Sequence, residues 1–111
     1  MIKTDRKALL IGKNGHAQGK LIELSATEAG IIATRGAQPG TELELVFEIP
    51  AHQRFVTLKI LSKVTYRHNT NHGTYLKLSF ENISPENSDA IDDFLNYKKR
   101  LKEFGKKTKV Q

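Results

Sequence analysis

The sequence predicts a single small domain that is mainly β, with antiparallel strands closed by one C-terminal helix. Hydrophobic and polar residues alternate over several segments in the first two thirds of the 111-residue chain, which is the period of strands with one wet face. The last third changes to the spacing of an amphipathic helix. The length suits one core, and a small barrel is compatible because closure removes unpaired sheet edges.

Three segments alternate most clearly. Residues 42–49 place leucine, phenylalanine and isoleucine on one face and mainly glutamate on the other, and residues 55–64 and 74–80 alternate in the same way. Residues 20–25 and 30–34 are shorter strand candidates. Turn-forming residues separate the segments at Asn14-Gly15, Pro39-Gly40, residues 50–54 and residues 67–73. Consecutive strands with short connections predict an antiparallel sheet of five or six strands.

The helix is predicted to begin near Ser84. This serine can cap the N-terminus, Pro85 is tolerated in the first turn, and Gly105 is a natural stop. Acidic residues lie in the first half and basic residues in the second half, as the helix dipole favours. The apolar side of the helix is expected to comprise Ile91, Phe94, Leu95, Leu101 and Phe104, with Tyr97 between them.

The net charge of +6 belongs to one end of the chain. Residues 98–111 hold seven basic residues and one acidic residue, so the rest of the chain is balanced. We therefore divide the chain into one domain over residues 1–97, which includes the start of the helix, and a basic helix end and tail over residues 98–111. Because the charge excess is confined to the tail, a nucleic-acid-binding face on the domain is not expected.

Several classes of protein are excluded or disfavoured. The chain has no cysteine, so disulfide scaffolds and thiol chemistry are excluded, and no apolar run approaches the roughly 18 residues of a membrane span. We expect a cytoplasmic protein. His68 and His72 are four residues apart but fall in a predicted connection, so we expect a polar loop and no metal site. No nucleophile and base stand at a recognisable spacing, so we expect neither an enzyme nor a cofactor.

One segment has the chemistry to bind a ligand. Within residues 19–32, Glu23 and Ser25 project from one face of a short strand and Gly30 follows. A carboxylate and a hydroxyl can read a purine edge, while the basic residues Lys3, Arg6 and Lys7 can neutralise phosphates. The alternative interpretation is an ordinary polar strand face beside a turn.

Recognisable segments follow one another along the chain: Arg6-Lys7, residues 19–31, Pro39-Gly40 before the strand at 42–49, residues 61–64, and residues 73–80 before the helix. In this order, from Arg6 to about Leu95, the chain resembles the PilZ domain, a bacterial receptor for cyclic di-GMP. The resemblance implies a six-stranded antiparallel barrel with a C-terminal helix. It also implies non-catalytic signalling, in which nucleotide binding folds the N-terminal segment against the barrel and alters a surface for a protein partner. Pilus, flagellar or exopolysaccharide machinery are the partners that the family suggests.

The family signature is Arg-x-x-x-Arg near the N-terminus and Asp/Asn-x-Ser-x-x-Gly on the strand and turn. Arg6 matches the first arginine, but Leu10 stands at the second. Ser25 matches, Glu23 replaces Asp or Asn, and Glu28 stands where the glycine is expected, which comes two residues later. Two interpretations stay open, a cyclic di-GMP receptor and a degenerate adaptor that acts through a protein. The site that the resemblance implies comprises Arg6, Lys7, Glu23, Ser25 and Gly30.

A second class of function is a single-stranded nucleic-acid binder built on a small barrel and recruited by the basic tail. Such proteins stack bases on aromatic side chains beside a cationic groove. Aromatic residues make up 7% of the chain and most fall at predicted core positions, which leaves Phe55, Tyr66 and Tyr75 as candidates. We therefore expect a signalling module rather than a single-stranded nucleic-acid binder.

Overall fold

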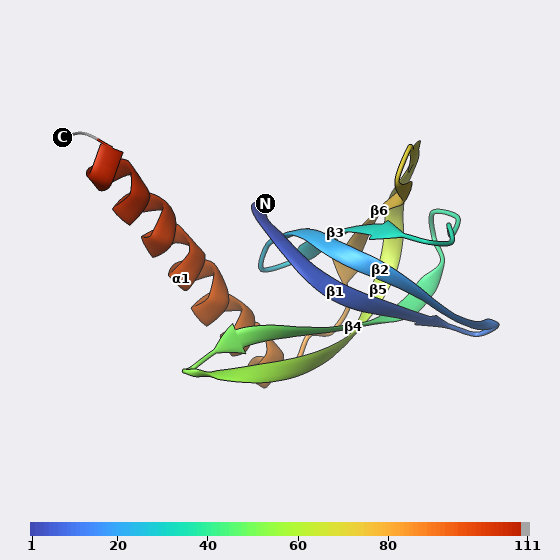
Figure 1. Cartoon of the computed structure of the whole chain (residues 1–111). Helices are drawn as coiled ribbons and strands as arrows, with labels where there is room; N and C mark the ends of the chain where they lie inside the picture. The colour runs from blue at the N-terminus through green and yellow to red at the C-terminus, as the bar shows by residue number, and fades with distance from the viewer. Residues whose placement is uncertain (110–111) are drawn as a thin grey trace.

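The computed structural model describes the backbone of residues 1–109 and the side chains of residues 1–104. Six strands precede one long helix, which leans against one end of the sheet and then extends away from it (Figure 1). The elements are β1 (Ile2–Gly12), β2 (Gly15–Leu24), β3 (Glu28–Ala33), β4 (Glu42–Ala51), β5 (Arg54–Thr70), β6 (Gly73–Phe80) and α1 (Pro85–Lys109).

The strands close into an antiparallel barrel in the order β1-β2-β3-β6-β5-β4, with β4 paired back to β1. Closure satisfies the backbone groups that an open sheet would expose at its edges. The mainly β fold and the six-stranded barrel with a C-terminal helix are therefore confirmed.

The core follows from the alternation of the strands. Leu45 and Ile49 of β4 and Leu58 of β5 are fully buried, and their neighbours in sequence point outward. Ala90, Ile91 and Phe94 of α1 belong to the same apolar cluster, so the first half of the helix is packed on the barrel. The predicted inward faces of residues 42–49 and 74–80 are confirmed.

One strand was not predicted from the sequence, and another is longer than predicted. Residues 2–12 form β1, although only the Asn14-Gly15 turn indicated a hairpin there, and they pair with both β2 and β4. The predicted connection at 67–73 is wrong, because β5 continues to Thr70 and only Asn71 and His72 form the turn. The residues at the end of β5 are polar on both faces, so no alternation marks them as a strand.

The start of the helix is as predicted, and its second half is not. The Ser84 hydroxyl accepts the N–H of Asn87 at 3.1 Å, which caps the helix before Pro85. The helix continues through Gly105 to Lys109, so the predicted stop is wrong. Leu101 and Phe104 are 51% and 72% exposed, which shows that only the first half of the predicted apolar side is buried. The last two residues of the predicted tail lie outside the described residues.

Candidate functional site

Ser25 lies in the tight turn between β2 and β3, so its predicted place on a strand is wrong, because β2 ends at Leu24. Its hydroxyl oxygen accepts the N–H of Glu28 at 3.0 Å and the N–H of Thr27 at 3.3 Å. Its own N–H donates to the Glu28 carbonyl at 2.9 Å. This hydroxyl therefore closes the turn, as serine commonly does when it bonds to the backbone a few residues ahead.

Glu23 lies across the strand from Gly30. The two residues are register partners of β2 and β3, and a Cβ atom at Gly30 would stand 2.5 Å from Glu23 Cγ. The glycine thus lets the Glu23 side chain cross β3 and reach β6. There its Oε2 accepts the hydroxyl of Tyr75 at 2.5 Å. Burial raises the pKa of the Tyr75 hydroxyl above its usual range, and the bond to Glu23 and the nearby carboxylates raise it further.

Glu28 and Lys77 complete a cluster of paired polar side chains on this outer surface. Lys77 Nζ lies 3.8 Å from Glu28 Oε2, and the Tyr66 and Tyr75 rings meet edge to face at 6.1 Å between centroids. We call the cluster the paired face; it comprises Glu23, Glu28, Gly30, Tyr66, Tyr75 and Lys77. Sequence reasoning missed Tyr75 as the partner of Glu23, because 52 residues separate the two.

Arg6 is directed toward β4 and β5. Its Nε donates to the Glu48 carbonyl at 3.0 Å, and its guanidinium lies 5.6 Å from the centroid of the Phe55 ring. Oε1 of the Glu48 carboxylate is 3.9 Å from Arg6 Nη2. Lys7 is exposed and is the register partner of Lys20.

The structure therefore brings Glu23 and Gly30 together and separates them from the two basic residues of the expected site. Among the described side chains, no hydrogen bond or ion pair joins Arg6 or Lys7 to Glu23, Ser25 or Gly30.

Leu10, which stands where the family has its second arginine, is 4% exposed and belongs to the barrel core. The basic residue opposite Glu23 is Lys3, its register partner in β1. Lys3 is exposed, and the residue spacing alone could not show that it faces this strand.

The two histidines with metal-like spacing lie on different elements. His68 is within β5 opposite Tyr75, and His72 is in the β5–β6 turn. Within residues 1–109, the structure contains no cluster of three or more possible metal ligands. The one helix in that part of the chain is not long and apolar enough to span a membrane.

A second surface feature is a groove between the β4–β5 hairpin and α1. It has a volume of about 760 Å³, and we call it the hairpin–helix groove. Both residues at the hairpin tip, His52 and Gln53, have positive φ angles of 53° and 67°. The groove is lined by Pro50, Ala51, His52, Gln53, Arg54, Phe55, Asp93, Tyr97 and Arg100.

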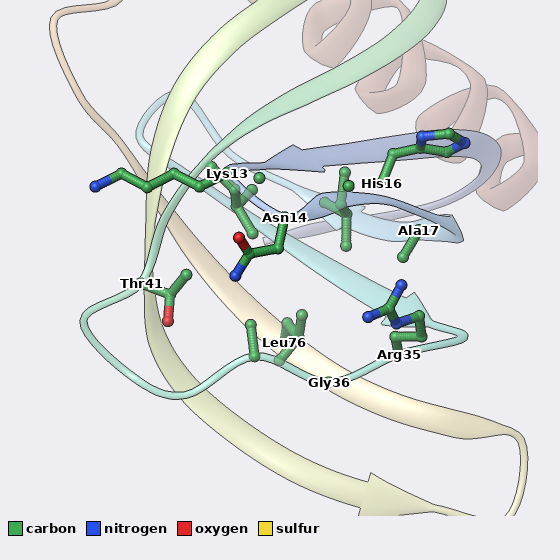
Figure 2. A pocket seen from close by; sticks show the side chains of 13 residues that line it. Lys13, Asn14, His16, Ala17, Arg35, Gly36, Thr41 and Leu76 are labelled. Carbon is green, nitrogen blue, oxygen red and sulfur yellow. The ribbon is translucent and has the colours of Figure 1, made fainter.

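A smaller hollow of about 280 Å³ opens at the other end of the barrel, beside the β1–β2 turn. Basic and polar side chains surround an apolar floor that includes Leu76. Figure 2 shows Asn14 directed toward the centre of this hollow, whereas the ammonium end of Lys13 points away from it. The charge of Lys13 is therefore not directed at a ligand there.

Comparison with known proteins identifies the fold and the family. No curated protein gives a significant match. The solved structure of the Bacillus subtilis inhibitor of motility (MotI/DgrA) matches with a TM-score of 0.75 and 14% sequence identity. The match covers 90% of this chain and 48% of that one, so the present chain spans about half the length of its structural relative. A family model for the PilZ domain matches residues 2–97, and the chain belongs to the PilZ domain family.

Proposed function

We propose that this chain is a non-enzymatic PilZ adaptor, which acts in the cytoplasm by contacting a protein partner and has at most weak affinity for cyclic di-GMP. PilZ modules are generally binding or adaptor domains. The structural relative is described as an inhibitor of motility. Motility machinery is therefore one partner class that fits, beside the pilus and exopolysaccharide machinery suggested by the family.

The observation that carries the proposal is the Glu23 side chain lying over Gly30 and bonded to Tyr75. A nucleotide that binds Glu23 Oε2 on this strand would have to displace the hydroxyl of Tyr75. It would also place phosphates near the charges of Glu23 and Glu28, and like charges repel.

The basic side chain expected to offset this repulsion is engaged elsewhere, since Arg6 contacts Glu48 and Phe55. The position of the second arginine is filled by Leu10, which is buried. Each charge-assisted contact that is lost costs about 1.5 to 3 kcal/mol, so two losses weaken binding by roughly a hundred- to ten-thousandfold.

Calorimetric titration with cyclic di-GMP at moderate salt tests the proposal, with linear GMP as the ligand control. We expect no saturable heat from the folded protein at high micromolar nucleotide. Arg6→Ala and Ser25→Ala are measured in parallel, and Lys13→Ala at the far hairpin is the matched control. Saturable binding that Arg6→Ala and Ser25→Ala abolish and Lys13→Ala leaves unchanged would identify a receptor and overturn the proposal.

The single-stranded nucleic-acid alternative has weaker support. Phe55 lies under Arg6 near the β4–β5 hairpin, whereas Tyr66 and Tyr75 contact each other across β5 and β6. Tyr75 is also committed to Glu23. These aromatic side chains therefore do not form one continuous stacking track beside a cationic groove, which is the arrangement such proteins use.

A further inference from the structure

The apolar stripe of α1 continues beyond the part of the helix that the barrel covers. Phe94 is 2% exposed, but Tyr97 and Leu101, three and seven residues later on the same side, are 44% and 51% exposed. The second half of α1 extends away from the barrel (Figure 1). Large apolar side chains at this spacing normally face another surface.

The hairpin–helix groove borders this stripe. Phe55, on the hairpin side, is 64% exposed, and Tyr97 lines the groove from the helix side. The two aromatic rings thus contribute to opposite walls of one concave site. Aromatic side chains that offer large area with few rotatable bonds are typical anchors of protein interfaces.

The hairpin is fixed to the helix by His52. Its backbone N–H donates to Asp93 Oδ2 at 2.9 Å, and its ring Nε2 lies 2.7 Å from Asp89 Oδ2. These contacts join the hairpin tip to two successive turns of α1. The walls of the groove are therefore held in place before a partner arrives, which lowers the ordering cost of binding.

The residues that line the groove carry more positive than negative charge. Arg54 and Arg100 both line it. Asp93 is the one carboxylate among the described residues that line the groove, and it is engaged by His52. A partner with negative charge beside an apolar strip complements this arrangement.

We propose that the hairpin–helix groove binds an acidic, amphipathic segment of the protein partner. Its apolar side chains lie between Phe55 and Tyr97, and its carboxylates pair with Arg54 and Arg100. This inference rests on the adaptor role proposed above and defines the chemistry of the partner. Helical segments that place apolar residues at i, i+3, i+4 and i+7 bind grooves of this kind.

Other occupants fit the groove less well. A second copy of the chain would bring the same two arginines face to face, because a two-fold interface joins like to like. A single-stranded nucleic acid would need a continuous stacking track, which Phe55, Tyr66 and Tyr75 do not form. The recessed shape also suits a narrow peptide segment better than a broad membrane surface.

The test uses two fluorescently labelled amphipathic helical peptides with identical leucine stripes. One carries glutamate at its flanking positions, and the other carries lysine there. Anisotropy titration of the full-length protein is expected to give saturable binding of the glutamate peptide only. We expect the Arg54→Glu/Arg100→Glu double variant and the Tyr97→Ala variant each to weaken it by at least about tenfold.

Lys13→Glu is the matched control, because it reverses a charge on the opposite hairpin and is expected to change affinity less than about twofold. Circular dichroism melting establishes that every variant is folded. The inference is overturned if the glutamate peptide fails to bind, if the lysine peptide binds equally well, or if the groove variants leave binding unchanged.

Sedimentation of the protein alone and titrations with anionic vesicles and with single-stranded DNA complete the test. Dimerisation, vesicle binding or DNA binding that is stronger than glutamate-peptide binding and is lost in the groove variants would assign the groove to that occupant instead. The cyclic di-GMP titration reports on a different ligand and on Ser25, so failure of the adaptor proposal is distinguishable from failure of this one.

Discussion

The paired face and the hairpin–helix groove are both on the outer surface of the molecule, but they differ in how far their side chains are paired within the domain. On the paired face, Glu23 bonds to Tyr75 and Glu28 lies near Lys77. In the groove, Phe55 and Tyr97 are largely exposed, and two arginines line the walls. The comparison shows that Glu23 and Glu28 beside the signature strand are paired within the domain, whereas the rings of Phe55 and Tyr97 in the groove stay largely exposed.

The largest expected effect is a difference in unfolding free energy between substitutions in the two halves of α1. Phe94→Ala removes a buried ring from the core and is expected to cost about 3 to 5 kcal/mol of unfolding free energy. Leu101→Ala, on the same apolar stripe, is expected to change it by less than about 0.5 kcal/mol. Urea unfolding measures both values. Equal losses would mean that the second half of α1 is packed in solution, and the groove could not then be open.

A substitution on the paired face tests whether Glu23 covers Gly30. Gly30→Ala introduces a Cβ atom 2.5 Å from Glu23 Cγ, so the side chain must move and lose its bond to Tyr75. We expect a cost of about 1 to 3 kcal/mol. The Glu23→Ala/Gly30→Ala double variant removes the obstructing side chain, so the two losses should be less than additive in denaturant unfolding. Strict additivity would contradict the close packing.

A smaller effect is expected from Tyr75→Phe, which removes the hydroxyl and leaves the partly buried Glu23 carboxylate without this donor. We expect a loss of about 1 to 2 kcal/mol at neutral pH. The pKa of Tyr75 is raised in the folded protein. The stabilisation is therefore fully present below the ordinary tyrosine pKa of about 10 and declines as pH rises above it, because the unfolded chain then loses the proton first.

Urea unfolding between pH 7 and about 10.5 checks this pH dependence. The stability difference between the wild type and Tyr75→Phe should stay constant at the lower values and shrink at the upper ones. Tyr66→Phe is the control, since no hydrogen bond of its hydroxyl is found within the described residues. A difference that does not change with pH would argue against the bond to Glu23.

The smallest expected effect is a gain in stability from a substitution at the hairpin tip beside the groove. Gln53 has a φ angle of 67° at the hairpin tip, a conformation that glycine adopts without strain. Gln53→Gly is expected to raise the unfolding free energy by about 0.5 to 1 kcal/mol. Thermal melting measures the gain. An unchanged or lower melting temperature would argue against strain at this position.

Alternation in the sequence predicted the central strands well, because a strand with one buried face alternates apolar and polar residues along its own sequence. Residues 42–49 and 74–80 are within β4 and β6, with the expected faces inside. The end of β5 was missed, since it projects beyond the core and needs no apolar face. The first strand was missed for a related reason: its first residues are exposed or only half-buried.

The candidate site was harder to predict than the fold. The sequence predicted Glu23 and Ser25 on one face of a short strand. The structure places Glu23 in β2, but Ser25 lies in the turn that follows, because β2 ends at Leu24. The directions of Arg6 and Glu23 depended on partners 42 and 52 residues away. No local pattern encodes such pairs, because they form only when β1 meets β4 and when β2, β3 and β6 lie side by side.

The sequence by itself determined the strand-rich composition, the capped helix, the basic C-terminal end and the family resemblance. These are properties of neighbouring residues, governed by side-chain period, capping and turn chemistry. Tertiary structure decided which polar groups are paired and which apolar groups stay exposed. Closure of the barrel turned Arg6 toward Phe55 and brought Tyr75 to Glu23, and the length of α1 carried Tyr97 and Leu101 past the barrel. Those outcomes depend on contacts between distant segments, which exist only in the folded chain.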